Sequence, residues 1–118
     1  MTSPIEIAVE HRPVPTIVSI QRATAEHFGI SLDRLICRRR NAELVRPRWI
    51  AIWIARKLTA HSIPAIGREF KRDHTTIMYA LQQMELLRKS KSLSRAISKI
   101  TDKINKYDDA DFAAGLLE

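Results

Sequence analysis

The chain has 118 residues, of which 45% are hydrophobic, and a net charge of +7. This length favours one compact domain with tails over two domains. Cys37 is the single cysteine, which excludes an internal disulfide and fits a reducing cytoplasm. The longest apolar run, at 49–55, is far shorter than the roughly 20 residues needed to cross a bilayer. The N-terminus also lacks the basic start and apolar stretch of a secretory signal.

The positive charge is concentrated in the middle of the chain. Residues 16–89 contain 14 basic and 6 acidic side chains, a balance of +8, whereas the remaining residues contain 6 basic and 7 acidic side chains. A surface of this sign favours phosphate-rich partners, chiefly nucleic acid, although it could also attract an anionic membrane. Charge alone does not decide between these two partners.

The N-terminal third begins with an arm and continues with two helices. Prolines crowd residues 1–15, which predicts a flexible arm. Apolar residues on one helical face predict a helix over 16–28, and Gly29 can end it in the left-handed conformation. Ser31 is a suitable N-cap for a short helix over 32–37.

A basic segment and a strongly apolar helix follow. Residues 38–46 show no clear period and predict a basic loop. Pro47 suits the first turn of a helix over 47–60. Because apolar side chains surround much of this helix, we expect it to be the buried centre of the domain.

Two further helices are joined by a very short turn. Ser62 can cap a helix over 62–70, and an apolar i, i+3, i+4, i+7 pattern predicts the next helix over 74–89. Two helices connected so tightly must cross at a steep angle, which is the arrangement of a helix-turn-helix. The second helix of that motif can lie in the DNA major groove.

The chain ends in a C-terminal helix and an acidic tail over 90–118. Ser92 is a candidate cap, and apolar residues from Leu93 to Tyr107 recur at spacings of four and three. This helix either covers the core or pairs with another chain, and the tail is either frayed or a short docking segment. No segment shows the alternation of a strand, so the predicted fold is all-α with about six helices.

The start of the helix over 74–89 carries the most informative polar side chains. Asp73 can cap this helix and could also accept from a cytosine amino group. His74 and Thr75 are not required by the core and lie where base contacts are usually made. A catalytic base at His74 would need a nucleophile or a substrate pocket nearby, and the sequence indicates neither. The spacing of the histidines and Cys37 does not match a metal site either, so we expect no catalysis and no bound metal.

A second group of candidates is rich in arginine. Its members are Arg38, Arg39, Arg40, Arg46, Arg48, Arg56 and Lys57. They could form no more than a solvated surface. Guanidinium groups, however, make bidentate contacts to phosphate and guanine, and arginine can enter a narrow A·T-rich minor groove. We therefore treat the arginines as candidate DNA contacts.

Four motifs occur in a fixed order across about 70 residues. They are GISLDRLICRRR, VRPRWIAIWIARKLT, HSIPAIGREF and RDHTTIMYA, and RDHTT after an IPxIGxxF helix is highly specific. Together they resemble the C-terminal DNA-binding domain (domain IV) of the bacterial replication initiator DnaA. The resemblance implies an all-helical, Trp-repressor-like helix-turn-helix domain over 16–89. In the family, this domain binds a duplex element called the DnaA box.

The resemblance also implies roles for individual residues. Major-groove base contacts are expected from Asp73, His74 and Thr75, with Thr76 beside them, and the minor-groove arginine is Arg40. The other positions that match family contacts to bases or backbone are Arg48, Arg56, Ile63, Pro64 and Arg72. Additional candidates in the same basic segments are Arg38, Arg39, Arg46 and Lys71.

Three features depart from the family pattern. Lys71 alone separates Phe70 from Arg72 where the family usually has two glycines, so the turn is one residue shorter. Trp49 replaces the family's glutamine after RPR. Both changes could alter the preferred DNA sequence. The chain also contains no G-x-x-x-x-G-K-[ST] phosphate loop, so we do not expect it to bind ATP or to melt an origin by that route.

These observations predict a stand-alone, non-enzymatic protein that binds double-stranded DNA in the cytoplasm, at the nucleoid, without a cofactor or a membrane. It could regulate replication initiation, by competing with the initiator at its boxes, or transcription. One alternative is an interaction or non-specific DNA-binding module that has kept the fold but lost site selection. A fragment of a full-length initiator is another. The segment 92–117 could form the interface of a homodimer or bind a protein partner.

Overall fold

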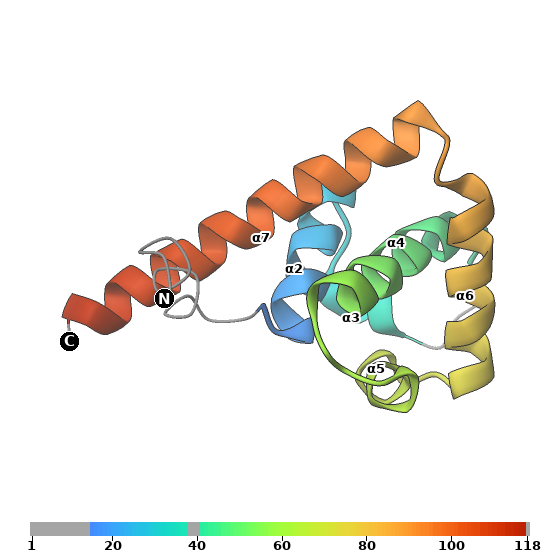
Figure 1. The fold of residues 1–118 in the computed structure, drawn as a ribbon, viewed down its shortest axis with the longest axis horizontal. Coiled ribbons are helices and arrows are strands. Elements are labelled where there is room, and N and C mark those ends of the chain that lie inside the picture. Colours follow the sequence, from blue (N-terminus) through green and yellow to red (C-terminus); the bar gives the residue numbers. More distant parts are fainter. Residues whose placement is uncertain (1–14, 38–40, 118) are drawn as a thin grey trace, which may run out of the picture.

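The computed structural model describes residues 15–37 and 41–117, with side chains described up to residue 106. These residues form six α-helices and no strand, which confirms the predicted all-α fold. The helices are α2 (Ile17–Phe28), α3 (Leu32–Ile36), α4 (Ala42–Leu58), α5 (Ile63–Phe70), α6 (His74–Leu87) and α7 (Lys91–Leu117), as Figure 1 shows. Of the predicted arm at 1–15, only Pro15 falls within the described residues.

Local capping sets three helix boundaries. The Ser31 side chain accepts a hydrogen bond from the Arg34 N–H at the start of α3, and Ser62 accepts from the Ala65 N–H at the start of α5. Gly29, with φ 66°, ends α2 in the left-handed conformation. All three capping predictions are confirmed. They could be made from the sequence because each cap depends on residues that are close along the chain.

The start of α4 corrects the sequence prediction. α4 begins at Ala42, so the expected basic loop is helical over 42–46, and Pro47 lies inside the helix rather than in its first turn. Leu44 is 1% exposed and Pro47 is also buried. Burial of these apolar side chains stabilises a turn that has no clear sequence period. Pro47 removes one bond to the Glu43 carbonyl, which lies close to the helix start.

α4 is the centre of the domain, as predicted. Its residues Ile50, Ala51, Ile54 and Ala55 are at most 2% exposed. Both α2 and α6 pack against α4, and α5 packs against α6 (Figure 1). The α5–α6 pair is therefore held on a rigid apolar support.

Gly67 and Lys71 build the tight turn between α5 and α6. The Arg72 N–H donates to the Gly67 carbonyl over 2.8 Å, and a Cβ at Gly67 would lie 2.7 Å from the Arg72 carbonyl oxygen. A larger residue at 67 would collide with the main chain. Lys71 closes α5 with φ 55° and ψ 43°, a left-handed conformation that glycine adopts without strain.

The first half of α7 packs against α2. Leu93, Ile100 and Ile104 are at most 5% exposed, and the Lys103 Nζ lies 3.2 Å from Glu26 Oε1 on α2. The apolar stripe up to Ile104 therefore covers the core of its own chain, which was one of the two expected roles. The backbone helix continues to Leu117, and its far end extends beyond the other helices in Figure 1.

The beginning of α7 differs in one detail from the prediction. The helix starts at Lys91, and the Ser90 side chain accepts a hydrogen bond from the Leu93 N–H over 3.3 Å. Ser90, not Ser92, is thus the capping residue, because the cap must precede the first helical residue. In the part of the chain that the structure describes, no helix is both long and apolar enough to cross a membrane.

Candidate nucleic-acid interface

The first residues of α6 form an exposed polar edge. Asp73 immediately precedes the helix, with φ −65° and ψ 150°, and His74, Thr75 and Thr76 occupy its first turn. All four side chains are exposed, whereas Ile77 behind them is fully buried. The short turn and the buried face of α6 thus orient these four residues toward solvent together.

The Asp73 carboxylate does not cap α6 in the way the sequence suggests. Asp73 occupies the N-cap position, but its side chain makes no capping hydrogen bond. The N–H groups of Thr76 and Ile77 instead donate to the Asp73 main-chain carbonyl, over 3.0 and 3.2 Å. The carboxylate accepts from Thr75 Oγ1 over 3.1 Å and lies 3.0 Å from His74 Nδ1. It therefore organises its neighbours' side chains rather than the helix backbone.

These contacts also keep the carboxylate charged. The hydrogen bond from the Thr75 hydroxyl, more than the contacts to His74, lowers the pKa of Asp73 below its ordinary value. The Asp73 carboxylate therefore stays ionised to a lower pH than an ordinary aspartate does. An ionised carboxylate can only accept hydrogen bonds.

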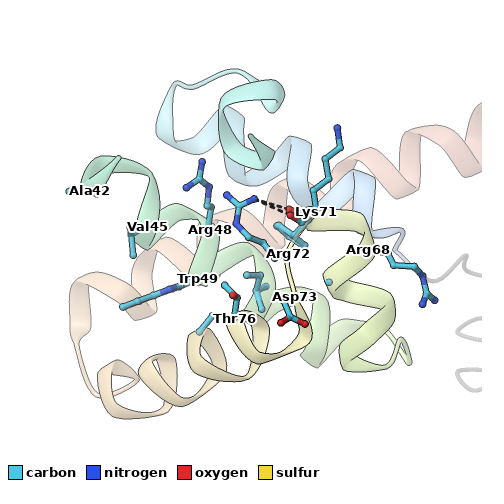
Figure 2. A pocket seen from close by; sticks show the side chains of 13 residues that line it. Ala42, Val45, Arg48, Trp49, Arg68, Lys71, Arg72, Asp73 and Thr76 are labelled. Carbon is cyan, nitrogen blue, oxygen red and sulfur yellow. Dashed lines mark hydrogen bonds between the residues drawn. The ribbon is translucent and has the colours of Figure 1, made fainter. Parts of the chain in front are cut away.

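A groove of about 920 Å³ lies beside this edge, between α4 and the α5–turn–α6 unit. Five of the predicted site residues line it, namely Arg48, Lys71, Arg72, Asp73 and Thr76, as Figure 2 shows. The groove also contains Trp49, whose ring meets the ring of Tyr79 edge-on at a centroid distance of 6.0 Å. Trp49 thus places a large apolar surface against α6, next to the predicted base-contacting residues.

Other predicted residues lie away from the groove lining. Arg46 is exposed in the first half of α4. Arg56 is exposed near the end of α4, where its Nη1 donates to the His61 carbonyl over 3.0 Å. At the start of α5, Ile63 is half-buried and Pro64 is exposed. Arg38, Arg39 and Arg40 lie outside the described residues.

Arg48 has an environment that the sequence did not indicate. It is only 8% exposed, and its guanidinium donates to the main-chain carbonyls of Arg34, Leu35 and Cys37. Arg72 also donates to the Cys37 carbonyl. A direct DNA contact by Arg48 remains a prediction from the resemblance.

Arg68 is a basic groove residue that the sequence analysis missed. It is exposed on α5 and lines the groove together with Lys71, and its side chain points outward in Figure 2. The signal was its position in the sequence, because Arg68 lies in the last turn of α5, three residues before Lys71, which ends that helix. Among the described residues, no three His, Cys, Asp or Glu side chains gather into a group that could hold a metal ion.

The amino-acid sequence that forms this site is similar to that of known proteins. The family model for the bacterial dnaA protein helix-turn-helix matches residues 17–84. The chain belongs to this family. The match begins with α2 and ends within α6, so the DnaA-type helix-turn-helix includes the groove, the turn and the exposed edge of α6.

Individual relatives support the same assignment. The chromosomal replication initiator protein DnaA of Caulobacter vibrioides (strain NA1000 / CB15N) is 46% identical over 91 residues, which is 75% of this chain and 19% of that protein. The DnaA of Cereibacter sphaeroides (strain ATCC 17029 / ATH 2.4.9) is 47% identical over 73 residues, 61% of this chain and 16% of that protein. The DnaA of Rhizobium meliloti is 39% identical over 92 residues, 76% and 19% respectively. The chain thus spans less than a fifth of the length of these relatives.

DNA binding follows from membership of this helix-turn-helix family. The structure adds that the surface expected to meet DNA combines an ionised acceptor at Asp73 with the basic side chains of Arg68 and Lys71.

Proposed function

We propose that the chain binds double-stranded DNA in a sequence-specific manner at DnaA-box-like sites. The observation that carries this proposal is the exposed edge of α6, where the contacts of Asp73 hold His74 and Thr75 in one defined arrangement. Side chains held in this way lose little conformational freedom on binding, so they can discriminate between bases.

The chemistry of this edge indicates which base atoms it would recognise. Asp73 accepts only, and the Thr75 hydroxyl uses its proton on Asp73, which leaves the lone pairs of Thr75 Oγ1 available. The His74 ring is oriented by its Nδ1, which lies 3.0 Å from Asp73 Oδ1. The acceptor atoms of Asp73 and Thr75 complement the amino groups of cytosine N4 and adenine N6, which are the major-groove donors.

Basic residues around this edge would hold the DNA backbone. Lys71 and Arg68 border the groove and Arg46 is exposed on α4, so all three can neutralise phosphates. Arg40 would enter the minor groove, as the resemblance implies. In this scheme the phosphate contacts set the register and α6 supplies the base contacts.

Selection of bound sequences from a random duplex pool tests the proposal. We expect recovery of a DnaA-box-like element. Thr75→Val and Arg40→Ala should then each cost about 1–3 kcal/mol on the recovered site and much less on a scrambled duplex. Lys89→Ala, an exposed change just beyond the other end of α6, is the matched control and should leave the preference for the site unchanged.

Failure to recover an enriched sequence would point to the alternative function. Binding that falls steeply with salt but shows no enriched sequence would identify the non-specific module instead.

The apolar face of α7 up to Ile104 packs on its own core, so this part of 92–117 does not favour a docking role.

The biological use that we propose is regulation without ATPase activity by this domain. A protein bound at DnaA-box-like sites would occupy them against the initiator and restrain replication, or would repress or activate a neighbouring promoter. Its place of action would be the cytoplasm, on the nucleoid. Chromatin immunoprecipitation followed by sequencing would distinguish the two uses, because origin sites and promoter sites map to different loci.

A further inference from the structure

Arg48 and Arg72 meet at a single main-chain oxygen. Arg48 belongs to α4 and Arg72 to the turn before α6, and both donate from Nη2 to the carbonyl of Cys37. The Arg48 bond measures 2.8 Å. Figure 2 shows the two guanidinium groups side by side above the groove. The end of α3, the first half of α4 and the turn are thereby joined at one point.

Arg48 makes further contacts to the same segment. Its Nε donates to the Leu35 carbonyl over 2.7 Å, and its Nη2 reaches the Arg34 carbonyl at 3.1 Å. The last carbonyls of a helix lack partners within the helix, and a guanidinium can satisfy several of them at once. At 8% exposure, Arg48 presents little surface to a ligand.

Arg72, on the turn before α6, is also fixed by several hydrogen bonds. Arg72 Nη1 lies 3.4 Å from the Phe70 carbonyl and 3.3 Å from the Lys71 carbonyl. The Arg72 main chain is fixed in turn by Gly67, through the 2.8 Å bond from the Arg72 N–H. The Cys37 carbonyl is therefore tied to the backbone that sets the start of α6.

We propose that Arg48 is a positioning residue: together with Arg72 it fixes the Cys37 carbonyl, and so sets where the chain leaves α3 relative to the base-contacting edge of α6. We name this junction the Cys37 clamp. Arg48 then acts on DNA through the backbone that it holds, and not by contacting a phosphate. The part of this proposal that concerns DNA rests on the proposed function.

The clamp itself can be tested without DNA. The Cys37 N–H donates to the Asp33 carbonyl over 2.9 Å, so its amide exchange reports on the last turn of α3. Arg48→Lys keeps the charge but loses the planar fork that reaches several carbonyls. We expect exchange at Cys37 to become at least about tenfold faster in R48K. Arg46→Lys, an exposed change on the same helix, should leave it unchanged.

DNA binding separates positioning from direct contact. In R48K, affinity for the selected site should fall by about tenfold while affinity for a scrambled duplex barely changes, because lysine preserves a simple phosphate contact. In Arg48→Met, the slope of log affinity against log salt should equal that of the wild type, whereas loss of a phosphate contact would reduce it by about 1. Thermal unfolding followed by circular dichroism ensures that every variant is measured well below its melting temperature.

Each outcome decides one part of the proposal. Unchanged exchange at Cys37 in R48K would overturn the clamp. Faster exchange with equal losses on both duplexes, or a reduced salt slope in R48M, would overturn positioning as the role of Arg48. If the wild type itself does not discriminate between the duplexes, the proposed function fails, and the exchange experiment still confirms or rejects the clamp.

Discussion

At the scale of single residues, Lys71 is the most unusual position in the turn before α6. Its φ of 55° lies in the left-handed region. In that region the Cβ of any residue other than glycine crowds the neighbouring carbonyl oxygen. The side chain is exposed, so no packing offsets this cost. A lysine here combines a left-handed backbone with a positive charge at the rim of the groove, and we propose that this charge contributes to DNA binding.

Replacing Lys71 separates strain from charge. Lys71→Gly should raise the free energy of unfolding by roughly 0.5–1 kcal/mol, because relief of the left-handed strain exceeds the greater flexibility of glycine in the unfolded chain. Urea denaturation followed by circular dichroism measures this difference. Lys71→Ala retains the Cβ and serves as the control, with little change expected. A glycine variant no more stable than the alanine variant would show that the turn is unstrained.

His27 gives the fold a dependence on pH. Partial burial, followed by the charges of Lys99 and Lys103, lowers the pKa of His27 below its ordinary value of 6.5. The unfolded chain therefore binds a proton at a higher pH than the folded chain, and stability falls as pH drops below that value.

Comparison of two variants tests this dependence. We expect the wild type to lose stability between pH 7.5 and pH 5.5, and His27→Gln to lose measurably less. Lys99→Gln should also reduce the loss, because it removes one of the charges that disfavour protonation of His27. Urea midpoints at the two pH values provide the measurement. An identical loss in the wild type and in H27Q would assign the dependence to other groups.

At the scale of elements, predictability follows the range of the interactions that set each boundary. Gly29, Ser31 and Ser62 act on neighbouring N–H and C=O groups, so the boundaries at these residues could be predicted from the sequence. The start of α4 could not, because burial of Leu44 depends on elements that are distant along the chain. Tertiary packing here overrides weak local periodicity.

The candidate site divides in the same way. The exposed edge at Asp73 to Thr76 could be predicted, since it follows from the turn and from the apolar period of α6. The burial of Arg48 could not, because its acceptor carbonyls lie 11 to 14 residues earlier in the chain. The carboxylate of Asp73 was expected to cap the helix, but the nearby Thr75 hydroxyl competes for it.

α7 should contribute to the stability of the helix-turn-helix domain, although the whole helix lies beyond the family match at 17–84. Ile100 is fully buried on α2, so Ile100→Ala should destabilise the domain by about 2–5 kcal/mol in urea denaturation. Lys106→Ala, an exposed change one turn and a half further on, should have an effect below about 0.5 kcal/mol. A neutral I100A would mean that α7 does not belong to the core in solution.

At the scale of the whole molecule, the distribution of charge matters more than its sum. Residues 16–89 carry a balance of +8, whereas residues 90–118 contain 5 basic and 5 acidic side chains and add nothing to the net charge of +7. Arg68 and Lys71 border the groove beside the predicted DNA-binding edge, and Arg46 is exposed on α4, which forms another wall of that groove. Release of counterions from DNA requires contact with phosphates, so only charges on this face should contribute to the salt dependence of binding.

Two variants of equal net charge test this distribution. Arg46→Gln and Lys106→Gln both lower the net charge by one. The first should reduce the slope of log affinity against log salt by about 1, with a nearly constant ratio between the selected and scrambled duplexes. The second should leave the slope unchanged, because Lys106 lies on α7, away from the groove lining. Fluorescence anisotropy at several salt concentrations measures both slopes. Equal reductions would mean that DNA responds to the overall charge, and the basic face around α6 would then lose its assigned role.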